Sequence, residues 1–224
     1  IIAGSFTQVQ ADFDMNAADQ TGILIGTFGG GVDGGELRAF KYVHADNSQK
    51  WHLWKYGAWG ADNSDPGNPH TAFIKSGAGF QYPLIVHLGN GNYLIIFRYN
   101  SPNTIYSAAR YSESPAPQWN WWDGAAWAQG GNYVFGQLSG IPATATVRVT
   151  ATSAGKASLF DRTVLNNQGI LHETAYDDAS GVFSARAMVT VTDLQPWLSK
   201  ADDAGTMWVF YTLNNNIYTI KKPL

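Results

Sequence analysis

Tryptophans in this chain fall into two groups beside polar turns, and that placement suits the binding of sugars. The chain has nine tryptophans in 224 residues. An indole ring stacks on the apolar C–H face of a pyranose, and neighbouring carboxylates or amides hydrogen-bond to the sugar hydroxyls. The sequence therefore indicates two candidate saccharide sites. The first comprises Trp119, Trp121, Trp122, Asp123 and Trp127, and the second comprises Trp51, Trp54, Trp59, Asp62 and Asn63.

The same tryptophans have a structural alternative, because large side chains also fill the space between packed sheets. Side chains alternate between the two faces of a strand, so Trp119 and Trp121 point one way and Trp122 points the other way. The tryptophans of the first group therefore cannot all share one buried face. Both interpretations stay open: the rings fill the core, or at least one of them contacts a ligand.

A loop from Gly60 to His70 concentrates oxygen ligands. Asp62, Asn63 and Asp65 lie within it, and carboxylates and amides at such spacing can wrap a calcium ion. The loop lacks the spacing and the final glutamate of an EF-hand, and a solvated turn explains the same residues. We expect no other cofactor, because the histidines are scattered without the spacing of a zinc site.

Three arginines, Arg38, Arg98 and Arg148, occupy equivalent positions in successive hairpins of the chain. Side chains repeated in this way would line a channel or a shared face. The alternative is that they face outward and keep the sheets soluble. Glycoside hydrolysis needs two carboxylates that converge on one bond, and no catalytic motif in the sequence brings such a pair together.

The composition excludes several classes of protein. Charged residues make up only 14% of the chain and the net charge is −3, which argues against a nucleic-acid partner because that partner requires a basic face. No apolar run is long enough for a membrane span. Cysteine is absent, which excludes a disulfide framework and thiolate sites. Glycine and aromatic residues replace the Ala, Glu, Lys and Leu runs of helical bundles.

Four hairpins with alternating apolar residues and polar turns start near residues 37, 93, 146 and 207. This pattern predicts antiparallel strands and an all-β chain, with one domain over residues 1–224. About four strands per interval predict a β-propeller with four blades. Five blades and a β-sandwich are the alternatives. The expected blades are 37–87, 93–138, 146–191, and 207–221 completed by the N-terminal strands of residues 5–28.

One stretch resembles a blade of the sialidase-like and related lectin propellers. It runs from Tyr82 to His87, then Gly91 to Tyr99, then Thr104 to Ser112, and ends in a tryptophan-bearing turn up to Trp127. The resemblance implies a propeller fold. Of the Ser-x-Asp-x-Gly-x-x-Trp box of sialidase repeats, only Asp123-Gly124-Ala125-Ala126-Trp127 is present, so the resemblance does not imply the enzymatic activity.

These observations favour a lectin-like module that binds an oligosaccharide or a cell-surface glycan. Such a module fits a secreted or extracellular protein, or a receptor-binding domain on a virion surface. A polysaccharide-acting enzyme, either a glycosidase or a lyase, is one alternative, and a structural or assembly domain is another. Formation of a homo-oligomer stays open.

Overall fold

The structure, a computed structural model, is all-β wherever it is described. Strands make up 73% of it, and no helix occurs within the described residues. None of these residues forms a helix long and apolar enough to cross a membrane. The prediction of an all-β chain with antiparallel sheets is confirmed. The described residues are 10–18, 20–28, 35–46, 51–55, 58–61, 75–100, 103–129, 134–166, 168–192, 198–201 and 206–223.

The first layer of the fold is an antiparallel meander with alternating burial. Ile23 and Ile25 are fully buried on one face, and Leu24 between them faces the opposite side and is only partly buried. This is the period-2 pattern of a strand that is fully covered on one face. The strands of this layer are β1 (Gln10–Asn16), β2 (Thr21–Phe28), β3 (Gly35–Val43), β4 (Trp51–Lys55) and β5 (Ala58–Ala61).

A long strand, β6 (Lys75–Gly89), starts the second layer and joins it to the first. It pairs with β3 near Gly35 and Leu37, and its stretch from Phe80 to Gly89 pairs with β7. These pairings unite both layers in one 10-stranded sheet. The other strands of the second layer are β7 (Asn92–Asn100), β8 (Thr104–Ser112), β9 (Gln118–Trp122) and β10 (Trp127–Ala128).

Two smaller antiparallel sheets form the third and fourth layers. In the third layer, β14 and β15 pair with different parts of β13. The third layer contains β11 (Thr146–Ser153), β12 (Lys156–Leu165), β13 (Gln168–Asp177), β14 (Val182–Phe183) and β15 (Ala187–Thr192). The fourth layer contains β16 (Leu198–Ala201), β17 (Thr206–Leu213) and β18 (Asn216–Pro223).

Asparagine and glycine make the tight turns of the hairpins. Between β6 and β7, Asn90 and Gly91 have φ angles of 53° and 73°. Between β17 and β18, Asn214 and Asn215 have φ angles of 51° and 60°. Two successive residues with positive φ form a type I′ turn, whose twist matches that of the flanking strands. The polar turns in the sequence thus set the ends of these strands.

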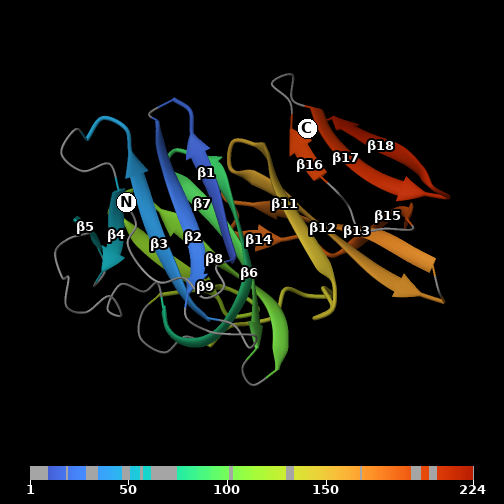
Figure 1. Cartoon of the computed structure of the whole chain (residues 1–224), viewed down its shortest axis with the longest axis horizontal. Coiled ribbons are helices and arrows are strands. Elements are labelled where there is room, and N and C mark those ends of the chain that lie inside the picture. Colours follow the sequence, from blue (N-terminus) through green and yellow to red (C-terminus); the bar gives the residue numbers. More distant parts are fainter. Residues whose placement is uncertain are drawn as a thin grey trace.

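The four layers stand side by side in the order of the sequence (Figure 1). One core joins the first and second layers and contains Ile25 and Phe97. A second core joins the opposite face of the second layer to the third layer and contains Ile96 and Leu159. The fourth layer packs on the third through Val209. β7 is buried on both faces, which explains why its sequence is a continuous apolar run from Tyr93 to Phe97.

The first strands of successive layers are neighbours. β6 contacts both β1 and β11, and β11 contacts β16. Between β1 and β6, two carboxylates bind the backbone: Asp12 Oδ2 accepts a hydrogen bond from the Ile85 N–H at 2.9 Å, and Asp14 Oδ2 accepts one from the His87 N–H at 2.6 Å. These side chains satisfy strand donors that would otherwise lack a partner.

The blade boundaries expected from the sequence are wrong. β1 and β2 (residues 10–28) pair with β3 and begin the first layer, rather than completing a sheet with residues 207–221. Residues 37–43 and 75–87, expected in one blade, belong to successive layers. Strands that follow one another in sequence pair most readily, because a short connection costs little closure entropy. The described residues do not close into a barrel or a propeller ring, so the structure does not confirm the predicted propeller, and their four layers differ from a two-sheet sandwich.

Replacement of Asp12 tests the junction of β1 and β6. Asp12→Asn is expected to retain stability at neutral pH, because its amide oxygen still accepts the Ile85 N–H. Asp12→Ala is expected to lower the free energy of unfolding by about 1 kcal/mol, because it leaves that donor unpaired. Urea unfolding of both variants beside the unchanged protein measures the difference, and equal losses in the two variants would contradict the hydrogen-bonding role.

The ionisation of Asp12 makes the stability of the protein depend on pH. Burial raises the pKa of Asp12 above its usual range, although backbone hydrogen bonds from Ile85 and Phe13 oppose the shift. The folded state therefore holds this proton more tightly than the unfolded state does, so the Asp12 carboxylate lowers stability once the pH rises from the ordinary aspartate pKa through the raised one. Asp12→Asn removes the ionisable carboxyl group and with it this loss of stability. We expect the variant to lose less stability than the unchanged protein between acidic and neutral pH.

Candidate functional site

Four of the tryptophans expected at saccharide sites are part of the core. Trp54, Trp119, Trp121 and Trp122 are only 2–7% exposed. A ring enclosed by protein offers no face to a sugar, so these residues are corrected from ligand contacts to core side chains. The reason is that the second layer is covered on both sides: Trp119 and Trp121 lie in the core shared with the first layer, and Trp122 lies in the core shared with the third.

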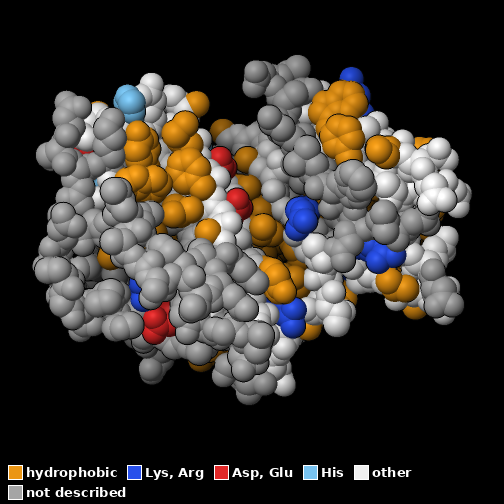
Figure 2. All heavy atoms as spheres, viewed as in Figure 1, with side chains coloured by type: hydrophobic (Ala, Val, Ile, Leu, Met, Phe, Trp, Pro, Cys, Tyr) orange, Lys and Arg blue, Asp and Glu red, His pale blue; other side chains and the backbone are white. Residues whose placement is uncertain are grey.

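The other three tryptophans are partly buried. Trp59 donates a hydrogen bond from Nε1 to the Tyr111 hydroxyl at 2.6 Å, and Trp127 donates one to the Gly181 carbonyl at 2.8 Å. Trp51 packs on Tyr42, with ring centroids 5.1 Å apart. It packs with Leu24 and Phe40 in a small cluster apart from the core that joins the first and second layers. Figure 2 shows hydrophobic side chains gathered over β1 to β3 of the first layer.

The acidic residues of the two candidate sites have different positions. Asp123 is exposed, and its Oδ1 accepts hydrogen bonds from the N–H groups of Ala125 and Ala126 at 2.8 and 2.7 Å. These backbone bonds lower the pKa of Asp123 and show that it shapes the turn. Asp62, Asn63 and the candidate calcium ligand Asp65 lie outside the described residues. Within the described residues, no group of three acidic or histidine side chains could hold a metal ion.

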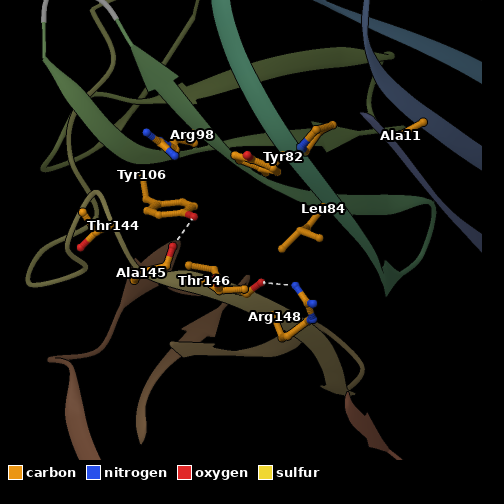
Figure 3. A pocket seen from close by; sticks show the side chains of 11 residues that line it. Ala11, Tyr82, Leu84, Arg98, Tyr106, Thr144, Ala145, Thr146 and Arg148 are labelled. Carbon is orange, nitrogen blue, oxygen red and sulfur yellow. Dashed lines mark hydrogen bonds between the residues drawn. The ribbon is translucent and has the colours of Figure 1, made fainter. Parts of the chain in front are cut away.

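A pocket of about 550 Å³ lies between the second and third layers, close to β1. Strands β6, β7 and β8 form one side, and the segment leading into β11 forms the other (Figure 3). The lining residues are Ala11, Tyr82, Pro83, Leu84, Arg98, Tyr106, Thr144, Ala145, Thr146, Val147 and Arg148.

Tyr82 projects into the pocket from a break in β6. The β6–β7 register shifts between Gln81 and Leu84, and Tyr82 has a φ angle of 48°. Such an irregularity re-aims a side chain away from the regular alternation of a strand. As a result, the side chain of Tyr82 is 51% exposed, although its neighbour Pro83 is buried. Tyr82 is therefore a large aromatic side chain that the fold leaves open to solvent at this site.

Arg98 ends the row of β7 side chains that faces the third layer. Leu94 and Ile96 precede it on the same face and are fully buried. The Arg98 guanidinium lies over the Tyr82 ring, 5.9 Å from its centroid. This is within the range of a cation–π contact. Arg98 Nε is buried and has no hydrogen-bond partner among the described residues.

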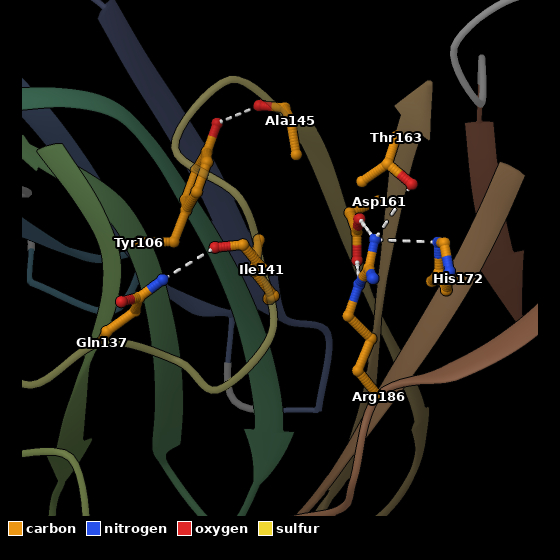
Figure 4. Close-up of polar contacts among 8 residues, drawn as sticks. All are labelled: Tyr106, Gln137, Ile141, Ala145, Asp161, Thr163, His172 and Arg186. Carbon is orange, nitrogen blue, oxygen red and sulfur yellow. Dashed lines mark hydrogen bonds and ion pairs between the residues drawn. The ribbon is translucent and has the colours of Figure 1, made fainter. Parts of the chain in front are cut away.

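On the opposite side of the pocket, side chains donate hydrogen bonds to backbone carbonyls. The Tyr106 hydroxyl donates to the Ala145 carbonyl at 2.7 Å, and Gln137 Nε2 donates to the Ile141 carbonyl at 3.2 Å (Figure 4). Burial raises the pKa of Tyr106, so the phenol stays protonated as this donor. Arg148 Nη1 donates to the Val147 carbonyl at 3.1 Å. These bonds fix the segment that carries Thr144, Thr146 and Arg148.

The lining of the pocket combines polar and aromatic groups. It contains two arginines, threonine hydroxyls and an exposed phenol ring. The arrangement offers an aromatic face beside hydrogen-bond donors, as in small-molecule sites with a few placed polar groups.

The sequence pattern found part of this pocket and missed the rest. Of the three arginines at equivalent hairpin positions, Arg98 and Arg148 line the pocket, whereas Arg38 lies 3.6 Å from Glu36 in an ion pair. Tyr82 was not among the residues predicted to bind a saccharide. Its signal in the sequence was the following proline, which marks a break in a strand.

Two other polar clusters contain ion pairs, one between the second and third layers and one within the third layer. Asp178 on the third layer binds Arg110 at 2.8 Å and Asn92 at 2.9 Å, both on the second layer. Asp161 forms a two-pronged ion pair with Arg186 inside the third layer (Figure 4). In both clusters the charged groups bind one another, so we assign them to stability.

The fold and the pocket define an all-β protein of layered antiparallel sheets with an arginine-lined pocket between two layers. The chain matches no protein-family model and no curated protein sequence.

Proposed function

We propose that this protein is a saccharide-binding module and that the pocket between the second and third layers is its binding site. The observation that carries the proposal is the half-exposed Tyr82 ring beside Arg98, in a pocket with hydroxyl and guanidinium donors. A pyranose has an apolar face for the ring and hydroxyls for the donors. In this proposal a tyrosine, rather than the tryptophans expected from the sequence, stacks on the sugar.

We also infer that the four layers are successive blades of a propeller. The support is that each layer is an antiparallel meander and that the first strands β1, β6, β11 and β16 follow one another as neighbours. In a propeller the first strands of the blades surround the axis. On this inference, the pocket lies beside the axis, where β1, β6 and β11 all contribute residues.

Tyr82→Asn is expected to weaken saccharide binding about tenfold, because it removes the stacking ring. Asparagine adopts positive φ readily, so the break in β6 is preserved. Binding is found with a glycan array and measured by titration calorimetry. The matched control is Tyr218→Asn, which removes a ring that is 40% exposed on β18, far from the pocket residues in sequence and in layer.

The control variant is expected to bind as the unchanged protein does. Equal weakening by both variants, or unchanged binding by Tyr82→Asn, would place the saccharide elsewhere. If the unchanged protein binds no saccharide on the array, the proposed function is wrong.

A further inference from the structure

We propose that His172 makes the pocket sensitive to pH: a proton taken up by this histidine in mildly acidic solution displaces Arg186 from Asp161 and loosens the pocket wall that leads into β11. This inference concerns the regulation of the proposed site. Its effect on saccharide binding rests on the proposed function, whereas its effect on the wall requires no ligand.

The contact between Arg186 and His172 requires a neutral imidazole. Arg186 Nη2 lies 2.8 Å from His172 Nδ1, and a guanidinium has donors only, so Nδ1 must be the acceptor. The same guanidinium holds both oxygen atoms of the Asp161 carboxylate. A protonated ring donates from both nitrogens, so two donors and two positive charges would then lie at hydrogen-bond distance. The protonated ring and the present position of Arg186 therefore exclude each other.

Two charged groups face His172 within the third layer. Asp161 lies opposite it on β12, and Arg186 reaches it from the link between β14 and β15. Arg162 and Glu173 come next in β12 and β13, so their side chains belong to the opposite face. Burial is the largest effect that lowers the pKa of His172, Arg186 lowers it further, and the charge of Asp161 opposes both.

The elements on the other sides of the cluster are β15, the segment of residues 138–145 and β8 of the second layer (Figure 4). The neighbour of His172 on β15 is Met188. Residues 138–145 contain no ionisable side chain. On β8, burial raises the pKa of Tyr106, which therefore stays neutral, and Arg98 and Arg148 affect the charge of Tyr106 rather than that of His172.

The lowered pKa of His172 means that the folded protein binds this proton less tightly than the unfolded chain does. The arrangement around Arg186 is therefore fully stable above the ordinary histidine pKa, and it loses stability as the pH falls below that value. Asp12 acts in the opposite direction, since its carboxylate lowers stability as the pH rises. A variant of His172 separates the two effects.

The cluster adjoins the wall of the pocket. Asp161 pairs in register with Val147, which lines the pocket, and paired residues of neighbouring strands lie on the same face. Arg186 also packs closely on Gly140, where an added Cβ would lie 3.3 Å from the arginine Cδ. Gly140 belongs to the segment that carries Thr144 into the lining. Displacement of Arg186 thus removes support from this wall at two points.

Hydrogen exchange followed by mass spectrometry tests the effect on the wall, at about pH 7.5 and about pH 5, on either side of the ordinary histidine pKa. The exchange rates are corrected for the intrinsic effect of pH. The proteins are the unchanged chain, His172→Asn and the control His44→Asn. Asparagine keeps an acceptor oxygen for Arg186 and does not titrate. His44 is an exposed histidine that follows β3 in the first layer.

We expect protection of the amides in residues 138–147 to fall about threefold to tenfold at the lower pH in the unchanged protein and in His44→Asn. His172→Asn should show little of this fall. Titration calorimetry with a saccharide found on the glycan array is expected to give an affinity about threefold lower at the acidic pH, again with little change in His172→Asn.

An NMR titration of the unchanged protein needs no substitution in the cluster. The Cε1–H signal of His172 is expected to titrate below the ordinary histidine pKa, and the amide signals of residues 138–147 are expected to shift with the same midpoint. This measurement decides the proposal even if His172→Asn does not fold.

Equal loss of protection in the unchanged protein and in His172→Asn would overturn the switch, as would amide signals that do not follow the titration of His172. If protection falls as expected but saccharide affinity is equal at both pH values, control of the site by His172 is wrong. If no saccharide binds at either pH, the proposed function is wrong, and the exchange and NMR results decide the switch by themselves.

Discussion

Arg186→Met is expected to lower the free energy of unfolding by about 3–5 kcal/mol, because it leaves the Asp161 carboxylate buried without its partner. Asp161 is 1% exposed and lies on β12. Arg186 binds it at two points, with Nε 2.8 Å from Oδ2 and Nη2 2.5 Å from Oδ1. A removed partner costs more than a removed pair, because one charge then remains in a poorly solvated site.

His172 completes the cluster around this ion pair. Its Nδ1 lies 2.8 Å from Arg186 Nη2 (Figure 4), and burial together with the nearby arginine lowers its pKa. The imidazole is therefore held neutral and accepts the hydrogen bond from the guanidinium. Thr163 Oγ1 also lies 3.5 Å from Arg186 Nη2, so three side chains of the third layer share the arginine, and its loss is expected to be severe.

The double variant Asp161→Leu/Arg186→Met separates the ion pair from general packing. It removes both charges and replaces them with apolar side chains, so it is expected to recover most of the stability lost by Arg186→Met. Urea unfolding of the three proteins gives the comparison. A double variant as unstable as the single one would show that packing, rather than the unpaired carboxylate, causes the loss.

Trp121→Ala is expected to lower the free energy of unfolding by about 3–5 kcal/mol, because it leaves a cavity between the first and second layers. Trp121 is 2% exposed and packs edge-on against Phe135, with ring centroids 5.4 Å apart. Trp51→Ala is the matched control, since Trp51 is only partly buried, in a small cluster apart from the core that joins the two layers. We expect it to lose much less stability in the same unfolding measurement.

The variant also decides between the two roles that the sequence allows for tryptophan. Under conditions in which Trp121→Ala remains folded, saccharide binding at the pocket should equal that of the unchanged protein. Weaker binding by this variant with stability retained would show that Trp121 contacts the ligand after all.

Local pattern accounted for the elements of this fold. Alternating apolar residues and Asn or Gly turns predicted the strands of residues 92–112, and these are β7 and β8 joined as a hairpin. The grouping of strands into sheets was predicted less well. Strands of similar composition could pair with any of several others, so the sequence does not identify their partners. The hydrogen bonding of β2 to β3 shows that β1 and β2 begin the first layer.

The candidate site was also predicted only in part from the sequence. The repeat of arginine at equivalent hairpin positions pointed to a shared face, and Arg98 and Arg148 do line one pocket. Arg38 does not, because Glu36 binds it. Tyr82 reaches the pocket through a register shift in β6, and a shift of register follows from the pairing of two strands rather than from one strand alone.

The sequence by itself determined that the chain is all-β and that Trp121 and Trp122 face opposite ways, because the side-chain period of a strand is two. Whether either ring meets solvent was decided by the tertiary structure. The second layer packs on the first with one face and on the third with the other, so Trp121 and Trp122 are both buried. The same packing of layers leaves the pocket at their junction, where two arginines and a tyrosine from separate strands come together.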